Sequence, residues 1–156
     1  MGVSNGLWGK ILPKKNGAGN GWPQKERRRA PRYRLDLPVN FQVYSPSQPQ
    51  KRTLPVNART YDISESGIGL LMSRMEYDGM HLVTPGGPNS EQCRLDIEIP
   101  FGKDPIRVKG QAVWYVQNSE TFPPVFRVGV EFVELTAALK DKLHTFVSVC
   151  ASAAGG

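Results

Sequence analysis

Five arginines lie close together near the N-terminus: Arg27, Arg28, Arg29, Arg32 and Arg34. A planar guanidinium donates two parallel hydrogen bonds to a phosphate or to the O6/N7 edge of guanine, and it also stacks on base faces. Pro31, which stands between Arg28 and Arg32, disfavours a continuous helix, so we expect this stretch to run extended. The competing interpretation, for this stretch taken alone, is a basic linker whose charges are solvated.

A second group of candidate ligand-binding residues is the segment Asp62-Ile63-Ser64-Glu65-Ser66-Gly67. Asp and Ser favour turns by bonding to nearby backbone, and glycine permits a positive φ or the close approach of a ligand. An ordinary hairpin turn is therefore one interpretation. The other is a binding turn, in which Asp62 accepts from guanine N1–H and the 2-amino group, Ser64 binds a base or phosphate atom, and Gly67 leaves room.

The elements that must position these groups are short segments of alternating apolar and polar residues, which is typical of strands with one buried face. A more polar strand is expected over 52–62, and loops are expected over 45–50, 76–92 and 117–124. Six strands separated by turn residues predict an all-β antiparallel sheet closed into a barrel or sandwich. The expected apolar faces are Val39, Phe41 and Val43; Ile68, Leu70 and Met72; Leu95, Ile97 and Ile99; Ile106, Val108, Gly110, Ala112 and Trp114; and Phe126, Val128, Val130 and Phe132.

The hydrophobic period changes to that of a helix in the last part of the chain. Thr136 is the candidate N-cap of an amphipathic C-terminal helix of about three turns. Its apolar positions are Leu139, Leu143, Phe146, Val147 and Cys150. We therefore expect a domain over 26–150 and a frayed tail over 151–156. Residues 1–25 contain six glycines and two prolines, which predicts a flexible basic arm.

The net charge of +6 is concentrated at one end of the chain. Residues 1–34 contain nine basic residues and a single acidic one, whereas the remainder carries eleven basic and thirteen acidic residues. Such a basic stretch attracts phosphate, whether it belongs to a nucleotide, a nucleic acid or a lipid head group.

Several function classes lack support in the sequence. There is no Ser/His/Asp set in a recognisable context, no Walker-type loop and no paired carboxylates with supporting histidines, so we expect no enzyme. His81 and His144 have no partners at metal-ligand spacing, so we expect no metal. Cys93 and Cys150 fall in apolar patterns and are expected to be buried, reduced thiols. No apolar run has the length of a membrane span and no signal peptide is apparent, which predicts a cytoplasmic protein without membrane insertion.

Taken in order, the two polar groups resemble the signature of the PilZ domain family. Arg28-x-x-x-Arg32 stands before the first strand, and Asp62-x-Ser64-x-x-Gly67 follows it after a strand. The resemblance continues in Gly-Ile-Gly-Leu at 67–70, Gly-Gln-Ala-Val-Trp at 110–114 and Arg-Val-Gly-Val-Glu-Phe at 127–132. It covers residues 26–149.

The resemblance implies a six-stranded antiparallel β-barrel with a C-terminal helix, and binding of cyclic di-GMP. By the same resemblance, Arg28 and Arg32 would grip the phosphates and guanines of the ligand, and Asp62, Ser64 and Gly67 would line the opposite wall. The neighbouring Arg27 and Arg29 are further candidates for ligand contact, and Arg27 bears on whether one or two ligand molecules bind.

The function that follows is a cyclic di-GMP receptor, which passes binding to a downstream protein partner through an N-terminal conformational switch. Two alternatives remain open. One is a PilZ-fold interaction module without a ligand. The other is a basic nucleic-acid-binding small barrel, which the charged N-terminal stretch supports. The expected strands show no array of exposed aromatics suited to base stacking, so nucleic acid is the weaker alternative.

Overall fold

The computed structural model of the chain describes residues 31–83, 92–118, 120–121 and 124–155. The arm expected over 1–25 lies outside these residues, and so do Arg27, Arg28 and Arg29. Arg32, Asp62, Ser64 and Gly67 lie within them.

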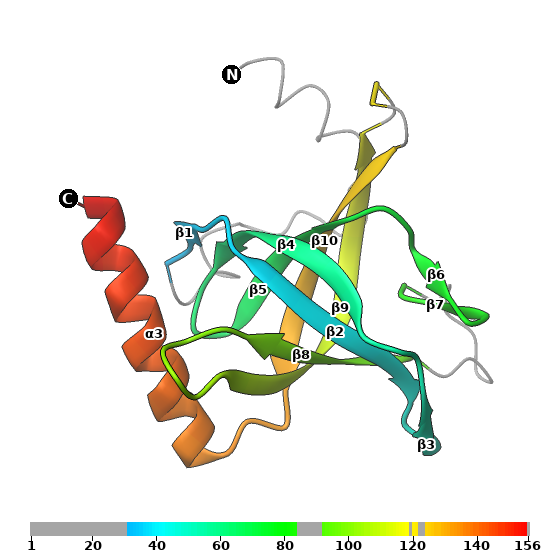
Figure 1. Cartoon of the computed structure of the whole chain (residues 1–156), viewed down its shortest axis with the longest axis horizontal. Helices are drawn as coiled ribbons and strands as arrows, with labels where there is room; N and C mark the ends of the chain where they lie inside the picture. The colour runs from blue at the N-terminus through cyan, green and yellow to red at the C-terminus, as the bar shows by residue number, and fades with distance from the viewer. Residues whose placement is uncertain (1–30, 84–91, 119, 122–123, 156) are drawn as a thin grey trace, which may run out of the picture.

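Six antiparallel strands close into a β-barrel (Figure 1). The order around the barrel is β4-β5-β10-β9-β8-β2, and β2 pairs with β4 to close it, with Pro38 opposite Arg59 and Phe41 opposite Val56. This confirms the six-stranded antiparallel barrel that the alternation and the resemblance predicted. The strands are β2 (Pro38–Ser45), β4 (Val56–Ile63), β5 (Gly67–Met72), β8 (Arg94–Ile99), β9 (Ile106–Asn118) and β10 (Val125–Val133).

Four short strands are added to this barrel. β1 (Tyr33–Arg34) pairs with the end of β4, and β3 (Gln48–Arg52) pairs with β2. β6 (Glu76–Tyr77) and β7 (Met80–His81) form a hairpin of their own. Its two turn residues are Asp78 and Gly79, with φ values of 51° and 81°, as a tight hairpin requires.

Two of the segments predicted to be loops contain short strands. β3 lies partly in the segment 45–50, and the β6–β7 hairpin lies in 76–92. The expected strand over 52–62 is in fact the end of β3 and most of β4. β3 has no buried face, so no apolar alternation marks it, and the strands of the hairpin are too short for a period to appear.

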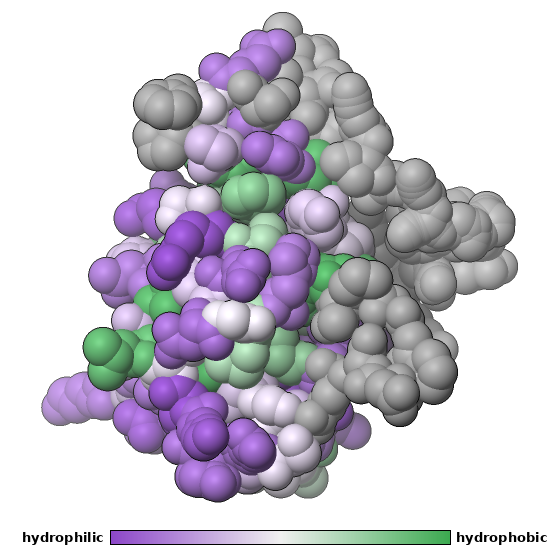
Figure 2. All heavy atoms as spheres, turned by 90° about the vertical axis from the view of Figure 1, so that its right-hand side faces the viewer, coloured by the Kyte–Doolittle hydropathy of each residue, from purple (hydrophilic) through white to green (hydrophobic). Residues whose placement is uncertain are grey.

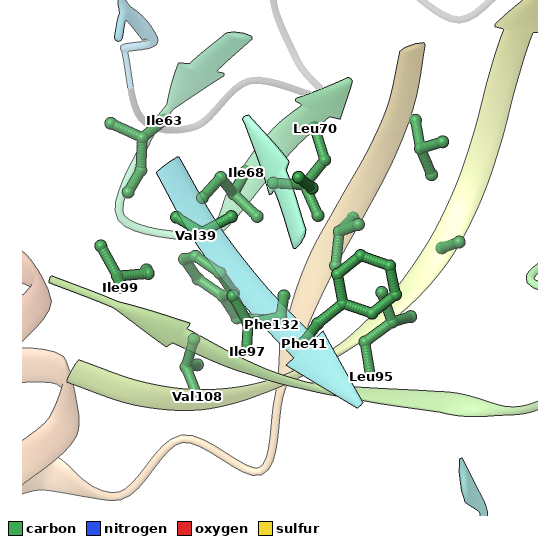
Figure 3. Packing of buried hydrophobic residues seen from close by; sticks show 14 of the residues in the cluster. Val39, Phe41, Ile63, Ile68, Leu70, Leu95, Ile97, Ile99, Val108 and Phe132 are labelled. Carbon is green, nitrogen blue, oxygen red and sulfur yellow. The ribbon is translucent and has the colours of Figure 1, made fainter. Parts of the chain in front are cut away.

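Side chains from all six barrel strands fill the interior (Figure 3). Phe41 from β2, Leu70 from β5, Leu95 and Ile97 from β8, and Val108 from β9 are at most 1% exposed. The inward faces expected for β2, β5 and β8 are confirmed, as is most of the face of β10, because the period-2 pattern of each strand matches a single buried face.

The expected inward position of Trp114 is wrong. The pairing of β9 with β10 shifts at one point, where Ala112 faces Val130 but Trp114 faces Gly129, which leaves Val113 as an extra residue. Such a β-bulge reverses the alternation beyond it. Trp114 therefore shares the outer face of the sheet with Gly129, and Tyr115, which lies opposite Val128 and packs against the core, takes the inward position beyond the bulge.

The C-terminal helix α3 (Ala137–Gly155) lies beside the barrel and contacts β1 and β9 (Figure 1). The expected N-cap is confirmed, because the Leu139 amide donates to Thr136 Oγ1 at 3.1 Å. The helix is longer than the expected three turns and continues through 151–155, where we expected a frayed tail. Its extra turn includes Ala151 and Ala153, and alanine is the strongest helix former.

The two cysteines, Cys93 and Cys150, are both free and buried, which confirms the prediction for them. No helix in the described part of the chain is long and apolar enough to cross a membrane. On the face that carries β3, β6 and β7, hydrophilic residues predominate and hydrophobic ones are scattered between them (Figure 2).

Candidate functional site

An ion pair joins the two polar groups that the sequence singled out. Arg32 precedes β1, and β1 pairs with the end of β4 so that Arg34 lies opposite Asp62. The Arg32 Nη1 atom donates to Asp62 Oδ1 at 3.0 Å. The side chains are 24% and 13% exposed, respectively, so the pair is partly shielded from water. The short strand β1 thus positions the second arginine of the first motif against the carboxylate of the second.

The segment between Asp62 and Gly67 is a turn held by its own hydrogen bonds. The Ser64 amide donates to the Gly67 carbonyl at 2.9 Å, and the Ser66 amide donates to Ser64 Oγ at 3.1 Å. Ser64 is only 1% exposed. Its hydroxyl organises the turn in this structure, and its direct contact with a ligand stays a prediction.

Three glycines on the outer face of β5 and β10 make a flat surface beneath the site, which we call the glycine floor: Gly67, Gly69 and Gly129. A Cβ atom on Gly67 would lie 2.5 Å from the Val130 carbonyl oxygen and 3.4 Å from Arg32 Nη2. At Gly69 it would lie 2.5 Å from Asp62 Oδ1, and at Gly129 it would overlap the Trp114 ring. The absent side chains therefore let Arg32, Asp62 and Trp114 lie close against the sheet.

Stacked aromatic and guanidinium groups continue the site across the strands. The guanidinium carbon of Arg34 lies 4.1 Å from the centre of the Tyr61 ring, and that of Arg127 lies 3.6 Å from it. Arg127 also lies 5.6 Å from the centre of the Trp114 ring. The result is a row of alternating cations and rings, drawn from β1, β4, β10 and β9, beside the Arg32–Asp62 pair.

Sequence reasoning did not identify Tyr61, Arg127 or Trp114 as site residues. Tyr61 directly precedes Asp62, while Arg127 and Trp114 belong to segments in which the family resemblance was noted. The signal was therefore present only as resemblance. Strand pairing brings the three side chains together, and no spacing in the chain encodes that pairing.

Arg127 is the most electrostatically unusual group of this site. Burial lowers the pKa of its guanidinium, and attraction to Tyr61 and Asp62 acts in the opposite direction. The positive charges of Arg34 and Arg32 add to the lowering. Its Nε atom is buried and has no hydrogen-bond partner in the described part of the chain.

The turn also contacts the C-terminal helix. Glu65 Oε2 lies 2.9 Å from His144 Nδ1 of α3, and the Phe132 amide of β10 donates to the Ser66 carbonyl at 2.9 Å. The Glu65 and His144 side chains are 46% and 67% exposed, so this pair contributes little to stability. The pair does connect the turn to α3, so a movement of the turn would act on the helix.

The chemistry of the site suits an anionic ligand with aromatic rings and hydrogen-bond donors. Arg32 supplies a cationic fork, and Asp62 supplies a carboxylate of which only Oδ1 is bonded within the described residues. The flat guanidinium of Arg127 and the rings of Tyr61 and Trp114 lie beside this pair. No group of three or more His, Cys, Asp or Glu in the described ranges is arranged to hold a metal ion.

Comparisons with known proteins identify the family and the fold. The family model described as "PilZ domain" matches residues 26–148. The fold resembles the PilZ domain with c-di-GMP of YcgR from Escherichia coli, with a TM-score of 0.56 and 17% identity, over 82% of this chain and 94% of that one. It also resembles YcgR in complex with c-di-GMP from the same organism, with a TM-score of 0.53 and 18% identity, over 82% of this chain and 47% of that one.

The two structural likenesses, at these identities, show a shared fold. A comparison with curated protein sequences gives no match. The family model spans most of the chain and contains both polar groups, β1 and the part of α3 up to residue 148. This chain is a member of the PilZ domain family.

Proposed function

We propose that this domain is a receptor for cyclic di-GMP. The observation that carries the proposal is the contact between Arg32 and Asp62 above Gly67, which joins the two halves of the family signature on one face of the barrel. A cyclic dinucleotide with two phosphates and two guanines needs guanidinium forks for its anions and guanine edges, and a carboxylate for guanine donors. Both similar YcgR structures are complexes with c-di-GMP.

In this proposal each site residue has a chemical role. Arg32 and Arg28 bind the phosphates and the guanine O6/N7 edge, with Arg27 and Arg29 available beside them. Asp62 accepts from guanine N1–H and the 2-amino group. Gly67 leaves room for the ligand, while Ser64 holds the turn and contacts a base or phosphate atom if the turn opens.

The proposed role is binding without catalysis, in the cytoplasm. A receptor needs no group that makes or breaks a bond, and the Arg32–Asp62 pair suits recognition. The two buried free thiols suit a reducing compartment, where disulfides are rare. The surrounding positive charges of Arg34 and Arg127 would attract a dianionic ligand from solution.

The finer proposal is that the ligand acts on the N-terminal segment. Arg32 directly precedes β1, so a ligand that grips Arg28 and Arg32 against the Asp62–Gly67 turn would fix the chain entering the barrel. Ordering costs about 1–2 kcal/mol per residue immobilised, which charge-assisted hydrogen bonds to two phosphates can offset. A downstream protein partner would then sense the redirected segment 1–25.

Calorimetric titration of the full chain tests the receptor proposal directly. Cyclic di-GMP should bind at micromolar or tighter affinity, which is about −8 kcal/mol or better. GMP should bind far more weakly because it cannot place two guanines at once. Cyclic di-AMP should also bind weakly, since adenine has no N1–H to donate to Asp62. Absence of heat with cyclic di-GMP would instead favour a PilZ-fold interaction module without a ligand.

A further inference from the structure

Arg127 is placed where its charge costs stability. It lies on the outer face of β10, half-buried, and no carboxylate of the described residues is within ion-pair distance of it. Burial lowers the pKa of its guanidinium, and its Nε atom has no hydrogen-bond partner there. A buried cation that lacks a bonded partner is less favourable than an apolar side chain of similar size. Packing alone does not explain an arginine at this position.

The contacts of Arg127 lead to the ligand-binding carboxylate. The pairing of β4 with β5 passes from Thr60 opposite Leu70 to Asp62 opposite Gly69, so Tyr61 is an extra residue outside the regular ladder. The bulge leaves Tyr61 out of the pairing with β5, although its carbonyl accepts from the Leu35 amide at 3.1 Å, so side-chain contacts add to what holds the residue. Arg127 at 3.6 Å from the Tyr61 ring is one such contact.

A second guanidinium reaches the same ring from another strand. Arg34 lies 4.1 Å from the centre of the Tyr61 ring. Because the strands run in the order β1-β4-β5-β10, Arg34 and Arg127 approach β4 from opposite sides in the sheet. The two arginines thus clamp the residue that directly precedes Asp62.

We infer that Arg127 is a positioning residue for the cyclic di-GMP site: its guanidinium, stacked on Tyr61, holds the Tyr61–Asp62 bulge so that the Asp62 carboxylate is presented to guanine. This inference rests on the proposed function. Arg127 itself need not touch the ligand. The unpaired, partly desolvated charge is the cost of keeping a flat cation against the ring and near the carboxylate.

A positioning role predicts opposite effects on stability and on binding. In Arg127→Met an unbranched apolar chain replaces the buried charge, so the Tm should stay unchanged or rise. The affinity for cyclic di-GMP should fall about tenfold, because the stacking on Tyr61 is lost. The matched control is Arg107→Met on β9, whose side chain is 71% exposed and faces Glu98. It should change neither quantity.

Two further variants separate positioning from simple charge attraction. Arg127→Lys keeps the charge but not the planar stack, and it should bind nearly as weakly as Arg127→Met. In a Tyr61→Leu background, Arg127→Met should cause little additional loss of affinity, because the ring through which it acts is gone.

Titrations and thermal unfolding of these full-length variants decide the inference. It is overturned if Arg127→Met binds like the wild type, if Arg127→Lys keeps full affinity, or if the two losses add independently. A lower Tm with unchanged affinity would make Arg127 a structural residue only. If the wild-type chain itself does not bind cyclic di-GMP, the proposed function fails instead, so the two failures are distinguishable.

Discussion

Arg32 and Asp62 are 30 residues apart in the chain, yet the Nη1 and Oδ1 atoms of these side chains are separated by 3.0 Å. The strand β1, which follows the arginine, pairs with β4 through two residues, Tyr33 and Arg34. The Arg32–Asp62 ion pair orients both side chains, and the short strand beside it is a segment that a bound ligand could rearrange.

Replacing Arg32 should weaken ligand binding far more than it weakens the fold. Arg32→Ala should cost about 2–5 kcal/mol of cyclic di-GMP binding, because ligand charge and the Asp62 carboxylate lose their shared partner. The free energy of unfolding should fall by at most about 1 kcal/mol, as it does when other partly exposed ion pairs are removed. Calorimetry and denaturant titration measure the two quantities.

The matched control for Arg32 is a second arginine–aspartate pair next to β1. Arg59 Nε lies 2.7 Å from Asp36 Oδ1, and both side chains are more than half exposed. Arg59→Ala should leave cyclic di-GMP affinity unchanged. Equal losses in both variants would mean that general positive charge, rather than the site geometry, governs binding. Arg28→Ala should match Arg32→Ala if Arg28 completes the motif, and greater losses for Arg27→Ala or Arg29→Ala would shift the motif.

The glycine floor predicts a loss of binding from one added methyl group. In Gly69→Ala the new Cβ would meet Asp62 Oδ1, so the carboxylate must move from its position against the sheet. Affinity for cyclic di-GMP should fall about tenfold or more, while the fold tolerates a shifted surface side chain. Gly102→Ala is the control, because φ is 59° at Gly102 and its Cβ would meet nothing within 4 Å. It should lower the Tm without changing affinity, and a Gly69→Ala variant that binds normally would contradict the floor.

Ordering of the N-terminal segment should be visible in amide hydrogen exchange. Saturating cyclic di-GMP should slow exchange over 26–36 and 60–68, because the ligand would join the arginine stretch to the Asp62–Gly67 turn. Residues 106–114 of β9 should exchange at the same rate in both states and serve as the internal control. Unchanged exchange over 26–36 despite full occupancy would show that the signal leaves the domain by another route, for which the Glu65–His144 contact with α3 is the first place to look.

The buried thiol of Cys93 predicts how stability depends on alkaline pH. Burial raises the pKa of Cys93 from 9.0 to about 11. Between these values the unfolded chain releases the thiol proton while the folded chain keeps it, so the free energy of unfolding falls as pH rises. The loss should reach about 2–3 kcal/mol near pH 11. Denaturant titrations from pH 8 to 11 should show a steeper fall for the wild type than for Cys93→Ala, and parallel curves would contradict the burial effect.

The sequence by itself determined the class of fold and the two halves of the signature. Alternation identified the inward faces of β2, β5 and β8, because one buried face per strand repeats every second residue. Thr136 marked the start of α3 because a side-chain acceptor must satisfy the first amides of a helix. These are local requirements, and each is met by residues close together in the chain.

Only the tertiary structure decided which side chains complete the site. Val113 at the bulge of β9 moved Trp114 to the outer face, although the local pattern predicted the inner one. Tyr61 and Arg127 meet across β5, although the strands β4 and β10 that carry them do not pair with each other. Bulges and cross-strand neighbours follow from how the whole sheet pairs and closes, and that closure depends on contacts between residues far apart in the chain.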